Sequence, residues 1–78
     1  MMMAKWSKYK GFNHGEFISY ELRNEENTKA SKVTKWGNTK ELKLYKRDIP
    51  KGGWTMCHTE QCDTVTIAKR KGEEWVNV

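Results

Sequence analysis

Apolar and polar residues alternate most regularly over residues 16–23. In an extended segment, Ile18, Tyr20 and Leu22 share one face, and the residues between them share the other. This pattern predicts a β-strand with one buried face. A weaker alternation of aromatic and basic residues over residues 5–12 predicts a first strand at the edge of the sheet.

The segment over residues 28–36 supports two interpretations. The polar residues 24–27 have the length of a hairpin turn, after which Val33 and Thr34 favour a second strand. The alternative is a helix over residues 25–36 that starts at an Asn N-cap and ends at a Gly. We expect the strand, because Thr, Ser and Val are mediocre helix formers.

Residues 39–48 are predicted to form the single helix of the domain. Asn38 and Glu41 have the spacing of a capping box, and the residues that follow are good helix formers. The exception is Leu44, which faces outward in this helix but joins an apolar face in a strand. A β-hairpin that turns at Gly37 and Asn38 is therefore the alternative.

The last third of the chain is predicted to be an antiparallel meander. The alternation of apolar and polar residues, with a turn at Lys71 and Gly72, indicates three short strands. These predicted strands are residues 54–58, 64–69 and 74–78, with a loop over residues 59–63.

Together these elements predict one small α+β domain over residues 1–78, with residues 1–4 disordered. An N-terminal hairpin and the C-terminal meander form a small antiparallel sheet, and the helix packs on one of its faces. An all-β barrel of five or six strands is the alternative. The predicted core consists of inward-facing apolar residues: Ile18, Tyr20, Leu22, Val33, Leu42, Tyr45, Ile49, Val65, Ile67 and Trp75.

Composition narrows this picture to a small domain held by aromatic packing. A chain of 78 residues buries only about 60% of its unfolded surface, and four Trp, three Tyr and two Phe supply large apolar side chains. No apolar run has the roughly 18 residues needed to span a bilayer. We expect a cytoplasmic protein in which Cys57 and Cys62 are reduced.

Positive charge is concentrated in the middle of the sequence. Eight of the fifteen basic residues fall within residues 28–51, where only Glu41 and Asp48 oppose them, so this segment carries a net charge of +6 against +5 for the whole chain. The eight are Lys29, Lys32, Lys35, Lys40, Lys43, Lys46, Arg47 and Lys51. We expect folding to gather them on one strongly basic face, with Lys40, Lys43 and Arg47 on the solvent side of the predicted helix.

Such a face predicts an anionic partner, because each phosphate that Lys or Arg neutralises adds salt-sensitive affinity. Aromatic residues near the N-terminus could add base stacking. The predicted binding residues are Lys29, Lys32, Lys35, Lys40, Lys43, Arg47, Lys51, Trp6 and Tyr9. Lys makes point contacts to phosphate, so we expect weak sequence specificity. The alternatives are a solvated surface that keeps the protein soluble and an ordinary edge strand around Trp6.

The N-terminal strand region resembles cold-shock proteins over about 14 residues. Lys5-Trp6, Lys10-Gly11-Phe12 and Phe17-Ile18 are similar to the first strands of that family. The chain departs from the family pattern at residues 13–16, and nothing after Leu22 matches. We therefore assign no family from this resemblance.

Candidate catalytic and metal-binding groups are few. Cys57, His58 and Cys62 could supply zinc ligands, but a second ligand pair is missing and His14 alone does not replace it. No phosphate-binding glycine loop and no nucleophile with a neighbouring base is recognisable. We therefore expect no metal, no cofactor, no small-molecule substrate and no enzymatic activity.

The sequence thus predicts a small, basic, non-enzymatic module that binds nucleic acid or a nucleoprotein complex and no membrane. The alternative is an inhibitor or adaptor that binds an acidic or nucleic-acid-binding groove on a host protein. In size and plan the chain resembles phage anti-defence proteins, without sharing a motif with them. In that case it would be a viral protein acting in the host cytoplasm.

Overall fold

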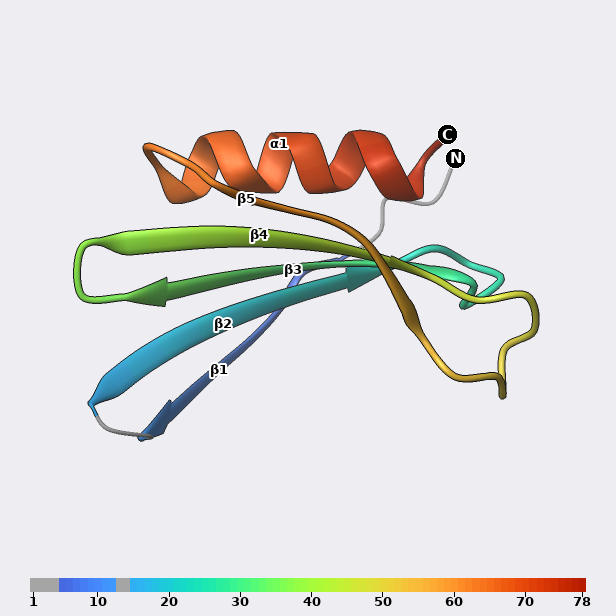
Figure 1. Cartoon of the computed structure of the whole chain (residues 1–78), viewed down its shortest axis with the longest axis horizontal. Coiled ribbons are helices and arrows are strands. Elements are labelled where there is room, and N and C mark those ends of the chain that lie inside the picture. Colours follow the sequence, from blue (N-terminus) through green and yellow to red (C-terminus); the bar gives the residue numbers. More distant parts are fainter. Residues whose placement is uncertain (1–4, 13–14) are drawn as a thin grey trace.

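The computed structural model of the chain describes residues 5–12 and 15–78. It contains a five-stranded antiparallel sheet, in which each strand pairs with the next one along the chain, and a C-terminal helix packed on it (Figure 1). The elements are β1 (Ser7–Phe12), β2 (Glu16–Arg23), β3 (Lys29–Trp36), β4 (Thr39–Lys46), β5 (Thr55–Gln61) and α1 (Val65–Val76).

This architecture confirms the predicted α+β class. The sheet is open, with β1 and β5 at its edges, and it is not closed into the alternative barrel. In the described ranges, no helix combines the length and apolar character needed to cross a bilayer. The predicted disorder of residues 1–4 and the candidate ligand His14 lie outside the described residues.

The core lies between α1 and the face of the sheet formed mainly by β3 and β4. Val33 and Leu42 are directly opposite each other on these strands, and both are fully buried against Ala68 of the helix. Leu22 of β2 is also buried. Each large apolar side chain removed from water in this way contributes about 1.5–3 kcal/mol to folding.

The first predicted hairpin is confirmed. β2 has the predicted bounds, and residues 29–36 form a strand and not the alternative helix. The connecting turn is held by Asn24, whose side-chain oxygen accepts hydrogen bonds from the backbone N–H groups of Thr28 (2.8 Å) and Lys29 (3.0 Å). Such bonds to nearby backbone are the reason that Asn favours turns.

The helix predicted over residues 39–48 is wrong, because residues 39–46 of this segment form strand β4. The hairpin that was the alternative is present, with Gly37 in its turn at a φ of 60°, a left-handed conformation that favours glycine. Leu44 shares the covered face with Leu42, and this apolar alternation outweighs the helix propensity of the segment. Ile49, predicted to be core, follows the strand and is 60% exposed.

The hairpin predicted over residues 64–78 is also wrong, because residues 65–76 form α1. Thr64 is the N-cap, and its side-chain oxygen accepts a hydrogen bond from the backbone N–H of Ile67. Gly72, which we predicted in a turn, lies inside the helix and is buried against the sheet. Apolar or small residues at positions 65, 68, 72 and 76 have the spacing of one helical face, which favours the helix over two short strands.

Strand β5 begins one residue later and ends three residues later than predicted, so residues 59–61 are strand where we expected loop. The register between β4 and β5 shifts between Leu44 and Tyr45, which leaves an extra residue on β5. Of the predicted core, Leu22, Val33 and Leu42 are buried, whereas Ile67 is exposed. Among the apolar residues that the structure describes, the prediction missed three that are buried: Ala30, Ala68 and Val76.

Candidate functional site

The helix covers one face of the sheet and leaves the other face uncovered (Figure 1). Because side chains alternate along a strand, the residues between the core positions point to the uncovered side. We call this side the open face. Strand register assigns to it Ser7, Tyr9 and Gly11 of β1, Phe17, Ser19, Glu21 and Arg23 of β2, Ala30, Lys32, Thr34 and Trp36 of β3, and Thr39, Glu41, Lys43 and Tyr45 of β4.

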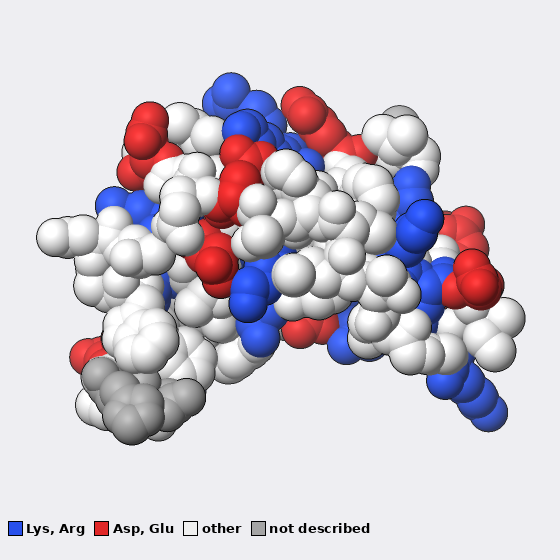
Figure 2. Space-filling view, in the orientation of Figure 1, with Lys and Arg blue, Asp and Glu red and all other residues white. Residues whose placement is uncertain are grey.

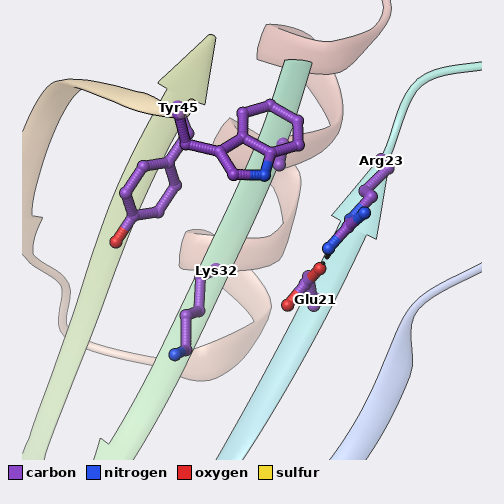
Figure 3. A pocket seen from close by; sticks show the side chains of 6 residues that line it. Glu21, Arg23, Lys32 and Tyr45 are labelled. Atoms are coloured by element: carbon purple, nitrogen blue, oxygen red, sulfur yellow. Dashed lines mark hydrogen bonds and ion pairs between the residues drawn. The ribbon is translucent and has the colours of Figure 1, made fainter. Parts of the chain in front are cut away.

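A hollow of about 170 Å³ lies on the open face. It is lined by residues from β2, β3 and β4 and from the segment before β5: Glu21, Arg23, Ala30, Lys32, Tyr45 and Trp54. In Figure 3, Lys32 and Tyr45 lie on one side of it, the ion pair of Glu21 and Arg23 lies on the other, and the helix is behind the strands. A second hollow of about 320 Å³ shares Glu21 and Arg23 and extends towards β1.

Trp54 is placed at the hollow by two arginines. The guanidinium carbon of Arg47 lies 3.9 Å from the ring centroid of Trp54, and that of Arg23 lies 5.4 Å from it. Arg47 also donates hydrogen bonds to the backbone carbonyl oxygens of Asn27 (2.8 Å) and Gly52 (3.2 Å). Arg47 therefore joins two loops and orients Trp54. Because its guanidinium group is engaged in these contacts, its main role at the hollow is to hold Trp54 in place.

The two acidic groups of the open face are each bound to a cation on the same face. Glu21 Oε1 accepts a hydrogen bond from Arg23 Nε at 2.7 Å, and Glu41 Oε1 lies 3.3 Å from Lys43 Nζ. These pairs reduce the negative charge that Glu21 and Glu41 present to solvent. The hollow thus offers mainly cations, aromatic rings and one small floor residue, Ala30.

Strands β3 and β4 also place lysines directly opposite one another. The three pairs are Lys29 with Lys46, Lys32 with Lys43, and Lys35 with Lys40. Like charges in this arrangement destabilise a sheet, on the order of 0.2–1 kcal/mol for each pair. Within residues 5–12 and 15–78, Lys43 is the only one of the six with a side-chain carboxylate oxygen within 4.0 Å.

These pairs alternate between the two faces, which corrects the expectation of a single basic surface. Lys32 and Lys43 lie on the open face, whereas the pairs on either side of them point to the face that carries α1. On the side shown in Figure 2, basic and acidic side chains are interspersed, without one basic patch. The cause is that residues 39–46 form a strand and not a helix. Lysines three positions apart, such as Lys40 and Lys43, point to opposite faces of a strand, whereas they would share one face of a helix.

The structure therefore brings together only part of the predicted binding set. Lys32, Lys43 and Tyr9 lie on the open face, and Lys32 Nζ lies 5.9 Å from the ring centroid of Tyr9. Arg47 is not among the residues that line the hollow but packs on the ring of Trp54, which does line it. The other members lie elsewhere: Lys29, Lys35 and Lys40 on the covered face, Lys51 in the loop before β5, and Trp6 against the helix.

Trp6 contributes to the core more than to the candidate site. Its indole N–H donates a hydrogen bond of 2.9 Å to Glu73 Oε1 on α1, and its ring packs against the cluster around Val33. Lys29 is similarly engaged, because its ammonium group donates to the carbonyl oxygen of Val78 at 2.8 Å and lies 4.8 Å from the ring centroid of Trp75. Both residues join the sheet to the helix.

Sequence reasoning missed Arg23, Tyr45 and Phe17 as residues of the candidate site. Alternation already separated Phe17 and Glu21 from the buried face of β2, and the same alternation extends to Arg23. Tyr45 was assigned to the core because β4 was expected to be a helix. In a strand, Tyr45 faces away from Leu42 and Leu44, which places it beside Ala30 on the open face.

The cysteine and histidine cluster is spread along β5. Cys57 is exposed, Cys62 is half-buried, and both are free thiols. Burial raises the pKa of the Cys62 thiol, which lowers its reactivity. His58 Nε2 lies 3.0 Å from Glu60 Oε1, and Lys71 Nζ lies 2.7 Å from Glu60 Oε2, so these side chains link the edge strand to α1. In the part of the chain that the structure describes, no three potential metal ligands lie together.

The candidate site is thus an open sheet face with a hollow, flanked by aromatic rings and two opposed lysines. We compared the chain with protein-family models, curated proteins and solved structures. No family model, curated protein or solved structure matches it.

Proposed function

We propose that this protein is a non-enzymatic module that binds nucleic acid, or a nucleoprotein complex, through the open face. The observation that carries the proposal is the directly opposed pair of Lys32 and Lys43 on a sheet face that the helix leaves uncovered. A sheet loses stability by opposing two ammonium groups. A bound phosphate would neutralise both, and departures from local stability rules are expected at functional sites.

The surroundings of the pair support the same ligand. Tyr9, Tyr45 and Trp54 present rings on or beside this face, and every nucleobase has a flat face that can stack on such a ring. The carboxylates of Glu21 and Glu41 are paired with Arg23 and Lys43, so they oppose an anion less than free carboxylates would. Lysine contacts are not directional, so the binding is weakly sequence-specific.

The free thiols of Cys57 and Cys62 suit a reducing compartment, and we place the proposed activity in the cytoplasm. Nucleic acid is accessible there, whether the protein acts in its own cell or, if it is viral, in that of a host.

The test is the affinity for nucleic acid of two variants with equal net charge. One removes the open-face pair (Lys32→Gln with Lys43→Gln), and the other removes the covered-face pair (Lys35→Gln with Lys40→Gln). Fluorescence anisotropy at about 50 mM and about 200 mM NaCl measures both affinity and its salt dependence. Circular dichroism of each variant checks that it is folded.

We expect the open-face variant to bind about tenfold more weakly at the lower salt concentration. If two phosphate contacts are lost, the slope of log K against log salt falls by about 1.4 for a single strand or about 1.8 for a duplex. The covered-face variant keeps the affinity of the wild-type protein. Equal losses in both variants would show that net charge alone drives binding, and absence of binding by the wild-type protein at low salt would reject the proposal.

A protein-binding inhibitor or adaptor is the second candidate, and one observation favours it. Trp36 is 44% exposed at the end of β3, and exposed tryptophans are frequent anchors of protein interfaces. Under this function the open face would bind an acidic or nucleic-acid-binding groove. A pull-down from nuclease-treated lysate tests it with wild-type protein and Trp36→Ala. A partner retained after nuclease treatment and lost with Trp36→Ala supports this candidate, whereas loss of all partners on nuclease treatment rejects it.

A further inference from the structure

Four aromatic rings on or beside the open face form one pair at each of its ends, whereas Tyr9 lies between these ends on β1. At one end, Phe17 and Trp36 are directly opposite each other on β2 and β3. At the other end, Tyr45 and Trp54 line the hollow, where Tyr45 is opposite Ala30. We call these pairs the Trp36 station and the Trp54 station. Six residue steps of β3 separate Trp36 from Ala30, a distance of about 20 Å at about 3.3 Å per residue.

The Trp36 station is shaped by two glycines. The ring of Phe17 lies over Gly11 of the neighbouring edge strand, so closely that a Cβ on Gly11 would clash with the ring. Gly15 has a φ of 136° and lies beside the Trp36 indole. A Cβ at Gly15 would be 3.0 Å from Nε1 of Trp36. An aromatic ring that covers a glycine of the next strand lies flat on the sheet. Phe17 therefore presents a broad ring surface next to Trp36.

The space between the stations holds two lysines, together with Glu21 and Glu41, whose carboxylates are paired with Arg23 and Lys43. Lys32 and Lys43 lie on the same face, two to four residues from Ala30 and Trp36 along the paired strands. The order along the open face is therefore aromatic, cationic, aromatic. A ligand complementary to this order has flat apolar groups about 20 Å apart and negative charge between them.

Single-stranded nucleic acid has this combination, because its bases can unstack and a phosphate lies between each pair of nucleotides. A duplex has the same charge, but its base faces are hidden inside the stack. We propose that the ligand is single-stranded nucleic acid that spans both stations, with bases on the rings at each end and backbone phosphates at Lys32 and Lys43. This inference rests on the proposed function and specifies its ligand.

Binding at two linked stations has a characteristic length dependence. An oligonucleotide too short to reach from one station to the other gains only one set of stacking contacts. Once the strand spans the distance, the second contact is made at a high effective concentration, and affinity rises steeply before levelling off. A ligand held by charge alone gains affinity gradually with each added phosphate.

The experiment measures anisotropy with fluorescent oligothymidines of about 2 to about 16 nucleotides and with a duplex of the greatest length. We expect affinity to rise steeply at the spanning length and the duplex to bind at least tenfold more weakly than the equally long single strand. Trp36→Ala lowers the affinity for long strands at least fivefold, as expected for one lost stacked base. The control is Phe12→Ala, which removes a ring that is 84% exposed but points to the opposite face of β1, and it leaves affinity unchanged.

The outcomes separate this inference from the proposed function. Equal affinity for duplex and single strand, together with the loss in the open-face lysine variant, would overturn the inference and leave the proposed function standing. A gradual rise with length, or equal effects of Trp36→Ala and Phe12→Ala, would also overturn it. If no nucleic acid binds at low salt, both fail. Circular dichroism and urea unfolding of the two alanine variants confirm that each is folded before its affinity is compared.

Discussion

Gly72 sets the distance between α1 and the sheet. A Cβ at this position would lie 2.8 Å from the Cβ of Ser31 and 2.9 Å from the ring atom Cη2 of Trp6. The close approach of α1 to β3 allows the fully buried Ser31 hydroxyl to donate a hydrogen bond of 2.8 Å to the Gly72 carbonyl oxygen. Buried hydroxyl groups need such a partner. The helix can therefore approach β3 closely only where it lacks a side chain.

Two effects of opposite sign decide the outcome of Gly72→Ala. Alanine favours the helix by about 1 kcal/mol, whereas overpacking of a tight interface costs about 1–3 kcal/mol. The clash would involve the Cβ of Ser31, whose position is fixed by the backbone of β3, and a rigid indole. We therefore expect a net loss in the free energy of unfolding, measured by urea denaturation. The control is Gly53→Ala, where a Cβ meets nothing within 4 Å. A variant at position 72 as stable as this control would contradict the close packing.

At the scale of the element, repulsion between directly opposed lysines destabilises the pairing of β3 and β4. Lys35 and Lys40 are directly opposite, and Lys35 is exposed. We expect Lys35→Gln to raise the free energy of unfolding by about 0.2–1 kcal/mol, because it removes this repulsion. The gain is larger at about 10 mM than at about 300 mM NaCl, since salt screens exposed charges. The control, Lys51→Gln in the loop before β5, changes stability by less than about 0.5 kcal/mol.

The contact between β5 and α1 depends on pH. Hydrogen bonds from Lys71 first, and then from His58, lower the pKa of the Glu60 carboxyl below its ordinary value of 4.5. The same hydrogen bond, which Lys71 donates to Glu60, raises the pKa of Lys71 above 10.5. Since the folded pKa of Glu60 is the lower one, its contribution to stability is present above about pH 4.5 and is lost as the pH falls through the folded value.

Glu60→Gln is therefore expected to be less stable than the wild-type protein at about pH 7, with a difference that shrinks towards about pH 3. Urea unfolding across this range measures it. Glu25→Gln, in the exposed turn after β2, serves as the control and shows no such trend. A difference between wild type and Glu60→Gln that is constant with pH would contradict the role of the carboxylate.

At the scale of the whole molecule, the layers predict an order of local stability. β3 is the central strand and lies under α1, whereas β5 is an edge strand that is almost entirely exposed. We expect backbone amides of β3 to exchange with solvent most slowly and the unpaired amides of β5 to exchange rapidly, as local opening is easiest where few groups are buried. Hydrogen exchange followed by NMR measures this order, and equal protection of the two strands would contradict it.

The α+β class and the first hairpin were predictable from the sequence, but the positions of the helix and of the basic residues were not. Residues 39–48 have good helix propensity. Residues 39–46 form a strand because the alternate spacing of Leu42 and Leu44 lets both side chains pack on the covered face of the sheet. Judged from its sequence neighbours alone, Gly72 indicates a turn, but in the structure it lets α1 pack closely against β3. The candidate site was half predicted: Lys32, Lys43 and Tyr9 lie together, and their neighbours Arg23 and Tyr45 were missed.

The sequence alone was enough to assign β2 and to favour β3 over the alternative helix, because alternation and an Asn turn act between residues close together in the chain. Only the tertiary structure decided which segment became the helix and which lysines share a face. Those outcomes depend on docking α1 against Val33 and Leu42, contacts between residues more than twenty positions apart. Because α1 covers only one face of the sheet, the other face stays open. Lys32 and Lys43 point to this open face, where they lie among the aromatic rings.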